Sequence, residues 1–320
     1  MWKADQMFGS LRNNPLSKLS NKKILSQLIH LPYEVMLRIP KNQPEFYNVF
    51  PKRTKNKTRI VQEPKEILKL SHKILNRLLM KIETPKYLFS GKKGFNYIDN
   101  AKFHLGNDYF LKIDISDFYP SCTKEAVFRF FRRKLKMSED LAWLITDLST
   151  FSNRIPTGSP VSQTLAYWAY KDTFDEINYY ADSLGLRFSL YVDDMVFSSK
   201  NKISNTVVPF VIRKLGEAGL RLKRRKKRGY GKSDFKLITG CIISPDCQLL
   251  VPYQLIENIF SQMNEKPDFD EYSEKEINSL IGRVQAAGQI ENGLYYSLLG
   301  KLKIHKKRVT ELDYLYKYGI

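Results

Sequence analysis

The sequence predicts an α+β fold, in which strands and separate helical segments pack around more than one core. Two observations lead to this prediction. Apolar residues recur at helical spacing in several segments, for example at Ile67, Leu70 and Ile74. Strand-like segments lie between them, and residues 188–192 and 195–199 are separated by only two residues, as in a tight hairpin. Strands joined by such a turn pair antiparallel, so we expect an antiparallel sheet.

The chain is long enough for several subdomains and apolar enough to fold. Its 320 residues exceed one average domain, so we expect two or three packed subdomains. The hydrophobic content of 42%, with 19 Phe and 19 Tyr, argues against disorder along most of the chain. Lys and Arg total 53 against 33 Asp and Glu, which gives a formal net charge of +20. A polyanion is therefore the expected partner, and nucleic acid comes before a membrane.

The cysteines and the lack of long apolar stretches predict a soluble, cytoplasmic protein. Cys122, Cys241 and Cys247 form neither an even set nor a CxxC pair, so neither a disulfide framework nor a structural zinc is expected. The first residues lack the apolar core of a secretion signal, and no stretch approaches the roughly 18 apolar residues of a membrane span. We therefore expect no membrane partner.

The amino-terminal third is expected to contain short helices, then a strand and a longer helix. Prolines interrupt the helical spacing within residues 1–50, which we interpret as a helical appendage. A basic run leads into a short strand at residues 58–62, and helical spacing follows over residues 67–82. A glycine-containing loop then precedes a mostly apolar strand, residues 109–115, that ends on the carboxylate of Asp114.

The central part is expected to alternate helices with the hairpin. Residues 123–150 have helical character, with Ser138 as a cap in front of two acidic residues. A Pro-Thr-Gly-Ser-Pro segment interrupts this pattern, and a tyrosine-rich helix is expected over residues 161–180. In the hairpin that follows, Asp193 and Asp194 are expected to form the turn.

The carboxy-terminal part is expected to combine a basic segment, two paired strands and helices. A helix near residues 205–218 precedes residues 221–228, which read RLKRRKKR, and the strands are expected over residues 235–244 and 247–251. Apolar residues recur at helical spacing in roughly the last 70 residues, which predicts a helical final subdomain.

Three aspartates lie at positions where a sheet can gather them. Asp114 ends one strand, and Asp193 and Asp194 lie at the hairpin turn, so an antiparallel sheet can bring all three to one edge. Carboxylates that lie close together take up protons unless a cation neutralises them. Two Mg²⁺ ions held by oxygen ligands would do so, and such a pair stabilises the attacking and leaving oxygens of a phosphoryl displacement. The alternative is that the Asp pair only forms a turn, in which Asp is favoured.

Three segments resemble, in this order, the palm motifs of reverse transcriptases: LKIDISDFYPS, PTGSPVSQTLA and SLYVDDMVFSS. The resemblance covers roughly residues 50–310 and implies a right-hand polymerase fold. The implied subdomains are an amino-terminal helical appendage at residues 1–50, fingers at 51–110, a palm at 111–250 with a fingers insertion near 123–155, and a helical thumb at 251–320.

The resemblance assigns the chemistry to the aspartates. Asp114, Asp193 and Asp194 would be the catalytic residues and the ligands of two Mg²⁺ ions, with the carbonyl of Ile115 as a further metal ligand. The reaction would be RNA-directed DNA synthesis from deoxynucleoside triphosphates (dNTPs). A catalytically silent RNA-binding scaffold is one alternative, and its expected mark is the loss of a metal-binding aspartate. None of the three is lost in this sequence.

Residues of the first two motifs match nucleotide-binding positions of the family. Tyr119 matches an aromatic residue beneath the sugar of the incoming nucleotide, where its ring would clash with a 2′-hydroxyl and exclude ribonucleotides. The alternative is a core aromatic residue beside Phe118. Gly158 would permit a close backbone approach in the floor under the nucleotide. Thr157 stands where the family more often has Gln, which puts one polar contact near the nucleotide in question.

Two basic residues match positions that contact the triphosphate. Arg59, in KTRIVQEP, matches a fingers strand whose basic side chain binds the incoming triphosphate, and a guanidinium suits phosphate. The alternative is a solvated strand end. Lys226 matches a lysine that protonates or neutralises the leaving pyrophosphate. Lys223 stands where the family usually has Asn, and many neighbours are basic, so a general nucleic-acid patch is the alternative role for Lys226.

Two further segments resemble signatures of retron reverse transcriptases. Residues 100–104 read NAKFH and match an Asn-Ala-x-x-His element through Asn100 and His104, and residues 238–240 read ITG and match a Val-Thr-Gly element with Ile for Val. A hydrogen-bonded structural histidine is the alternative for His104. The resemblance implies a cognate structured non-coding RNA as partner, which is copied in part into multicopy single-stranded DNA (msDNA) primed from a guanosine 2′-hydroxyl. It also implies a separate effector protein encoded nearby and a role in anti-phage defence.

The basic segment has two interpretations. A run of cationic side chains is usually a solvated face. With a polyanion already expected, we interpret this run and the basic carboxy-terminal helices as a surface for RNA that is recognised largely by shape. The residues assigned to this surface, with the two of the NAKFH element, are Arg224, Arg225, Lys227, Arg228 and Arg283.

The class of reverse transcriptase has one further alternative. Roughly 70 residues follow Val251, which suffices for a helical thumb but not for an additional nuclease domain, so a retroviral or mobile-intron enzyme is disfavoured. A different bacterial defence enzyme or an intron-derived reverse transcriptase that uses another primer stays open as the alternative to a retron enzyme.

Overall fold

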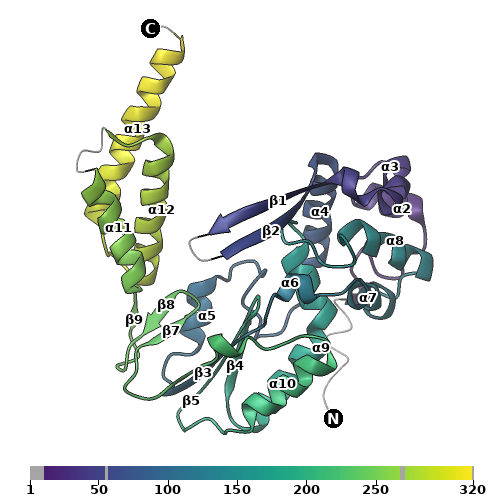
Figure 1. Cartoon of the computed structure of the whole chain (residues 1–320), viewed down its shortest axis with the longest axis horizontal. Coiled ribbons are helices and arrows are strands. Elements are labelled where there is room, and N and C mark those ends of the chain that lie inside the picture. The colour runs from purple at the N-terminus through teal and green to yellow at the C-terminus, as the bar shows by residue number, and fades with distance from the viewer. Residues whose placement is uncertain (1–10, 55–56, 267–270, 319–320) are drawn as a thin grey trace. The chain divides into compact units, whose positions relative to one another are not determined.

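The computed structural model describes residues 11–54, 57–266 and 271–318, which form two compact units (Figure 1). Unit 1 contains the described residues up to Asn96 together with Leu111–Gly229, and unit 2 contains Tyr97–Phe110 together with the described residues from Tyr230 onward. Each unit combines helices with antiparallel strand pairs, which confirms the α+β class. This grouping divides the expected fingers range, residues 51–110, between the two units.

Unit 1 begins with short helices that pack into its core. They are α2 (Lys22–Leu28), α3 (Tyr33–Arg38) and the 3-10 turns η1 (Ile39–Lys41) and η2 (Gln43–Phe46). Asn21 caps α2, because its Oδ1 accepts a hydrogen bond from the amide of Lys23 at 2.8 Å. Further upstream, Nδ2 of Asn14 donates to the carbonyl of Leu78 at 2.7 Å. The range expected as an appendage therefore supplies core residues from residue 11 onward.

A long hairpin and a helix follow these turns. The hairpin consists of β1 (Tyr47–Thr54) and β2 (Lys57–Pro64), and the helix is α4 (Glu66–Leu79). The sequence predicted β2 and α4 but missed β1. Residues 48–53 of β1 are all exposed, so the alternation of apolar and polar side chains that identifies a half-buried strand is missing, and Pro51 is untypical of a strand interior. The antiparallel register pairs Lys52 with Arg59.

A four-stranded sheet in the order β4-β5-β3-β6 holds the predicted acidic positions. Its strands are β3 (Tyr109–Asp114), β4 (Arg187–Tyr191), β5 (Asp194–Ser199) and β6 (Arg228–Tyr230). The hairpin turn differs by one residue from the expectation. Tyr191 pairs with Asp194, so Val192 and Asp193 form the turn, with Val192 at a φ of 58°, and Asp194 begins β5.

The central part of unit 1 also contains several helices. They are α6 (Phe118–Ser121), α7 (Lys124–Arg129), the π turn η3 (Phe130–Lys134), α8 (Glu139–Ser149), α9 (Ser162–Ser183) and α10 (Val207–Glu217). The range expected as helical, residues 123–150, is thus interrupted, and Lys136 has a φ of 53° between η3 and α8. Ser138 precedes α8 as expected, but its hydroxyl donates to the Asp140 carboxylate rather than capping a backbone amide. Leu165 and Phe174 of α9 are fully buried in the core.

Unit 2 contains a short sheet and the carboxy-terminal helices. Its elements are α5 (Tyr97–Phe103), β7 (Lys236–Ile238), β8 (Cys241–Ile243), β9 (Leu249–Leu250), α11 (Tyr253–Glu265), α12 (Glu274–Ile290) and α13 (Tyr296–Tyr318). The strand expected over residues 235–244 is in fact a hairpin of β7 and β8. Thr239 and Gly240 have φ values of 43° and 88°, which turn the chain between them.

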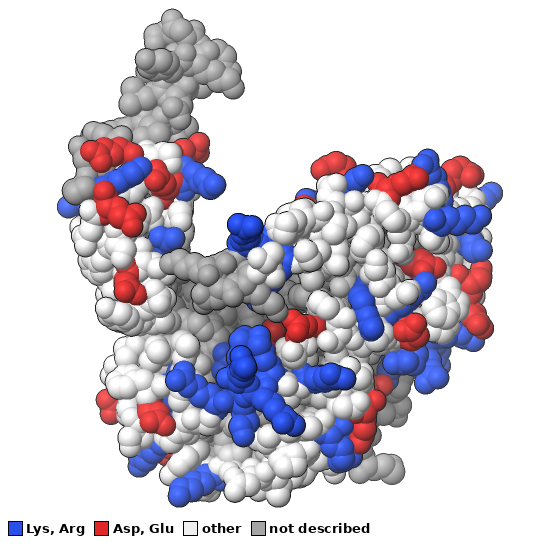
Figure 2. All heavy atoms as spheres, viewed as in Figure 1, with Lys and Arg blue, Asp and Glu red and all other residues white. Residues whose placement is uncertain are grey.

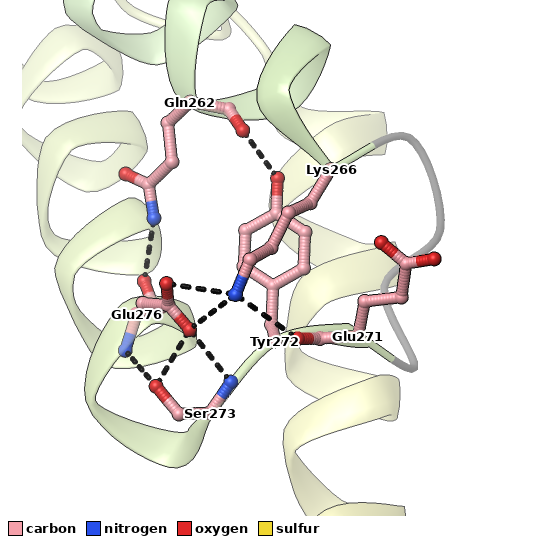
Figure 3. Close-up of polar contacts among 6 residues, drawn as sticks. All are labelled: Gln262, Lys266, Glu271, Tyr272, Ser273 and Glu276. Atoms are coloured by element: carbon pink, nitrogen blue, oxygen red, sulfur yellow. Dashed lines mark hydrogen bonds and ion pairs between the residues drawn. The ribbon is translucent and has the colours of Figure 1, made fainter.

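A cluster of polar contacts joins α11 to the start of α12 in unit 2 (Figure 3). Nζ of Lys266 lies 2.9 and 3.0 Å from the two carboxylate oxygens of Glu276. Glu276 also forms a capping box with Ser273, and the hydroxyl of Tyr272 donates to the carbonyl of Gln262 at 2.7 Å. The cluster thus joins the end of α11, the residues just before α12 and the first turn of α12.

Within the part of the chain that the structure describes, no helix combines the length and apolar character that a membrane crossing requires.

Candidate active site

An open pocket of about 820 Å³ lies in unit 1. Its lining comes from separate parts of the chain: strand β2, the end of β3, helix α6, the turn between β4 and β5, and the segment at η4 (Arg224–Lys226). The sequence-predicted residues that line it are Arg59, Asp114, Ile115, Tyr119, Asp193, Asp194 and Lys226. The fold therefore brings the expected metal-binding residues together with three of the four expected nucleotide-binding residues.

The backbone fixes the relative positions of the three aspartates. Asp114 is the last residue of β3, and its carbonyl accepts a hydrogen bond from the amide of Lys223 at 2.8 Å. The next amide, that of Ile115, donates to the carbonyl of Asp193 at 3.1 Å. Asp194 then begins β5, which neighbours β3 in the sheet. The carboxylates thus lie at the adjacent ends of two paired strands, as the sequence predicted for an antiparallel sheet.

Two lysines neutralise part of this acidic cluster. Nζ of Lys226 is paired with Oδ2 of Asp114, a residue that is only 2% exposed. Nζ of Lys112 lies 3.2 Å from Oδ2 of Asp194. Burial, and then the neighbouring Asp114 and Asp194 carboxylates, raise the pKa of Asp193 above its ordinary value. The hydrogen bond to Asp114 raises the pKa of Lys226, which keeps this ammonium group charged at neutral pH.

The donor atoms suit a hard divalent cation, although the lysines occupy two of them. Three carboxylates and the nearby Ile115 carbonyl are oxygen ligands of the kind that Mg²⁺ prefers. Over the described ranges, no group of three His, Cys, Asp or Glu side chains is arranged to hold a metal ion. Asp114 is instead paired with Lys226, and Asp194 with Lys112. A cation bound at the aspartates would compete with these lysines for Oδ2 of Asp114 and Oδ2 of Asp194.

Tyr119 and Arg59 lie in the same pocket on different elements. Tyr119 belongs to α6, which begins after Asp117, a residue with a φ of 43°. Its ring lies 5.8 Å from that of Phe118, and burial raises the pKa of its hydroxyl, with a smaller effect of Asp193. The ring is thus held against the core while it lines the pocket. The Arg59 side chain is exposed on β2.

Gly158 is the one expected nucleotide-binding residue outside the lining. A Cβ at Gly158 would lie 2.8 Å from both the Gln62 carbonyl oxygen and Cγ1 of Val61, so only glycine fits there. The close backbone approach that the sequence predicted at Gly158 is therefore an approach to strand β2. Its neighbour Thr157 lines the pocket instead.

The two residues of the NAKFH element are buried in unit 2. Asn100 and His104 each have 0% exposure. Nδ2 of Asn100 donates to Oγ1 of Thr239 at 3.2 Å, and this hydroxyl donates to the carbonyl of Tyr97 at 2.9 Å. The His104 ring lies 5.9 Å from the ring of Phe110. The NAKFH and ITG elements therefore bind each other, and neither the Asn100 nor the His104 side chain is presented at the surface.

The basic residues expected to bind RNA differ in their exposure. Arg224, Arg225, Lys227 and Arg228 are exposed at and after η4. Figure 2 shows a dense group of Lys and Arg side chains over the part of unit 1 where η4 lies. Arg283 of α12 is half-buried, and its Nη1 donates to Oε1 of Gln262 at 2.6 Å and to the carbonyl of Asn258 at 3.2 Å. Arg283 thus holds α12 against α11.

The sequence indicated no role for three residues that contact Asp194 or the loop at residues 157–159. Lys112 forms an ion pair with Asp194. The side chain of Gln62 accepts a hydrogen bond from the amide of Thr157. His72 of α4 is 1% exposed and contacts Ser159 through Nδ1 at 2.6 Å and the Leu148 carbonyl through Nε2 at 2.8 Å. No local signal identifies these residues, because each partner lies far away in the sequence.

The chain is similar to known proteins. A family model described as "Reverse transcriptase (RNA-dependent DNA polymerase)" matches residues 39–242. The retron Se72 reverse transcriptase of Salmonella heidelberg is 34% identical over 152 residues, which are 47% of this chain and 40% of that enzyme. The retron Ec86 reverse transcriptase of Escherichia coli is 27% identical over 242 residues, 74% of this chain and 75% of that enzyme. Among solved structures, a telomerase from Candida albicans with a fragment of telomeric RNA superposes with a TM-score of 0.49 and 10% identity, over 81% of this chain and 59% of that one.

Proposed function

Because the chain belongs to the reverse transcriptase (RNA-dependent DNA polymerase) family and resembles retron members of it, we propose that it is a retron-type RNA-directed DNA polymerase. The family match covers the three palm motifs and confirms the right-hand polymerase class that they imply. The first of the retron relatives aligns over less than half of its own length, so its activity is carried over here as part of the proposal.

The observation that carries the proposal is the convergence of Asp114, Asp193 and Asp194 in one pocket with Arg59 and Tyr119. In the proposed reaction, the 3′-hydroxyl oxygen of the growing DNA strand forms a bond to the α-phosphorus of a dNTP, and the bond to pyrophosphate breaks. Two Mg²⁺ ions held by the aspartates and the Ile115 carbonyl would stabilise the attacking and leaving oxygens.

Other residues of the pocket bind the triphosphate, select the sugar of the nucleotide and protonate the leaving pyrophosphate. Arg59 is exposed on β2 and offers a guanidinium for the triphosphate. The half-buried Tyr119 ring, which lines the pocket, excludes a 2′-hydroxyl by sterics, which selects deoxynucleotides. Lys226 carries its ammonium group beside Asp114, and it provides a proton for the leaving pyrophosphate.

The proposed template is a cognate structured non-coding RNA, with a guanosine 2′-hydroxyl as the primer of msDNA. The exposed arginines and lysines at η4 support an RNA surface in unit 1. Asn100 and His104 are buried, so we propose that they act through the shape of unit 2 rather than by direct contact with RNA. A separate effector protein encoded nearby and a role in anti-phage defence complete the proposal.

The experiment is to express the chain from its native locus, purify it and sequence the bound nucleic acid. Ribonuclease and a 2′,5′ debranching enzyme are applied separately and together. The proposal expects a discrete single-stranded DNA joined 2′ to 5′ to a guanosine of one RNA, and no such DNA with Asp193→Asn. Random RNA without a discrete DNA product, from an enzyme that still extends primers, would favour a reverse transcriptase of another class.

A further inference from the structure

The loop that carries Gly158 is fastened to strand β2 by four hydrogen bonds that involve residues 60, 62, 157 and 158. Oγ1 of Thr157 donates to the carbonyl of Ile60 at 2.9 Å, and the amide of Gly158 donates to the carbonyl of Gln62 at 3.0 Å. The amide of Thr157 donates to Oε1 of Gln62 at 3.2 Å, and the amide of Gln62 donates to Oγ1 of Thr157 at 3.4 Å. The loop and the strand are therefore held in one arrangement.

The same loop is also fastened to α4, through Ser159. Burial lowers the pKa of His72 to about 4, so its ring is neutral at pH 7. Nε2 lies 2.8 Å from the carbonyl of Leu148 and must donate, which leaves Nδ1 to accept a hydrogen bond from the hydroxyl of Ser159 at 2.6 Å. The loop is thus held by both β2 and α4, and Thr157 has little freedom to move away from Gln62.

These contacts decide which way the Gln62 amide faces. A backbone N–H only donates, so the group that meets the Thr157 amide is the oxygen of the Gln62 side chain. The single hydroxyl hydrogen of Thr157 goes to the Ile60 carbonyl, which is closer than Oε1. Among the described residues, no hydrogen-bond acceptor is recorded for Nε2 of Gln62. The donor end of this amide is left for a ligand.

Gln62 and Thr157 line the pocket that also holds the three aspartates, Tyr119 and Arg59. The pocket thus offers a neutral, oriented N–H donor in addition to the guanidinium of Arg59. We propose that Nε2 of Gln62 donates a hydrogen bond to a sugar or phosphate oxygen of the incoming nucleotide, and that Thr157 is the residue that orients this amide. The inference rests on the proposed function, because it names a further binding residue for the same substrate.

From the sequence alone, the polar contact near the nucleotide was in question, because Thr157 stands where the family more often has Gln. The structure brings a glutamine to this place from strand β2 instead. The amide and the residue that orients it lie 95 positions apart in the chain.

The test uses three substitutions in the full-length chain. Gln62→Glu keeps Oε1 for the Thr157 amide but loses the N–H donor, and Gln62→Met removes the donor without adding a charge. Gln27→Glu, at an exposed position of α2, makes the same chemical change far outside the pocket lining. Thermal unfolding of each variant checks that the fold is retained.

We expect KM for dNTPs on an RNA template to rise about tenfold in both Gln62 variants, with a smaller change in kcat and no change in Gln27→Glu. Thr157→Val keeps the backbone amide but loses the bond to the Ile60 carbonyl, so its KM should rise less. An unchanged KM in Gln62→Met would overturn the inference, even if Gln62→Glu is impaired, because charge repulsion alone would then explain the glutamate variant.

Nucleotide binding without turnover separates this inference from the proposed function. The equilibrium dissociation constant of a dNTP is measured by calorimetry in the presence of Mg²⁺ and RNA, in the Asp193→Asn background with and without Gln62→Met. A weaker dNTP affinity in the double variant supports the inference even if the wild-type chain extends no primer. Equal affinities contradict the inference, and primer extension by the wild type then leaves the proposed function intact.

Discussion

Asn100 in α5 and Thr239 in the turn between β7 and β8 are hydrogen-bonded, Nδ2 to Oγ1 at 3.2 Å, although 139 positions separate them in the chain. The hydroxyl of Thr239 in turn donates a hydrogen bond to the carbonyl of Tyr97. Two segments that the sequence singled out independently therefore meet in one buried arrangement. Their joint presence has a structural reason, since each needs the other as its partner.

The first prediction concerns this contact. Thr239→Ala removes the hydroxyl that binds both the Tyr97 carbonyl and the buried Asn100 amide, so it should destabilise the chain by about 1–3 kcal/mol. Thr239→Ser keeps the hydroxyl and is the matched control. Denaturant unfolding of the full chain measures both. Equal stability of Thr239→Ala and the wild type would contradict the structural role.

The second prediction concerns pH and the contacts of Glu276. Hydrogen bonds from Ser273 and Lys266 lower the pKa of Glu276 to about 2. A carboxyl group whose pKa is lowered on folding stabilises the fold above its ordinary pKa of about 4.5, and this stabilisation is lost as the pH falls towards about 2. Glu276→Gln should therefore melt at a lower temperature than the wild type at pH 7, and the difference should shrink as the pH falls below 4.5.

The control for this pH prediction is Glu274→Gln. Glu274 lies in the same first turn of α12 but is not paired with Lys266. It should change the melting temperature less at pH 7. A difference between Glu276→Gln and wild type that persists undiminished at pH 2.5 would show that the stabilisation does not come from the charged carboxylate.

The sequence revealed the parts of the site that depend on local patterns, and it did not reveal contacts between residues that are far apart in the chain. The strand that ends at Asp114 and the hairpin at Asp193 follow from local alternation and turn chemistry, and both were predicted. The pairing of Lys226 with Asp114 joins residues 112 positions apart, and no local periodicity encodes it. The same holds for the contact of Gln62 with Thr157.

The errors of the sequence-based prediction have identifiable physical causes. Strand β1 is solvated on both faces and has no apolar alternation to reveal it. The interruption between η3 and α8 was also missed. The apolar residues of 123–150 follow helical spacing, which does not reveal the break of the helical backbone at Lys136. Conversely, the buried Asn100 and His104 were expected at an RNA surface, since a sequence signature carries no information on burial.

The third prediction tests Tyr119. Tyr119→Val removes the ring that lines the pocket, so ribonucleotides should be accepted and the ratio of kcat/KM for dNTPs over ribonucleotides should fall about tenfold or more. Tyr179→Ala, at a tyrosine of α9 that is 61% exposed, is the control. The same ratio in the Tyr119 variant and the wild type would mean that this ring does not select the sugar.

The fourth prediction separates two effects of Lys226. Lys226→Met removes the ammonium group that pairs with Asp114, so less Mg²⁺ should be needed for half-maximal activity. It also removes a proton donor, so kcat at saturating Mg²⁺ should fall about tenfold or more. Lys202→Met, at an exposed position, controls for the loss of one positive charge. A higher Mg²⁺ requirement in Lys226→Met would contradict the competition between this lysine and the cation.

The most direct test is primer extension on an RNA template with dNTPs and Mg²⁺, comparing the wild type with Asp193→Asn. We expect DNA synthesis by the wild type and a loss of at least about a hundredfold in Asp193→Asn with RNA binding kept, because the pocket gathers Asp193 with Asp114 and Asp194. Asp182→Asn, an exposed aspartate of α9, should extend normally. Undiminished extension by Asp193→Asn would contradict the assignment of this pocket as the polymerase active site.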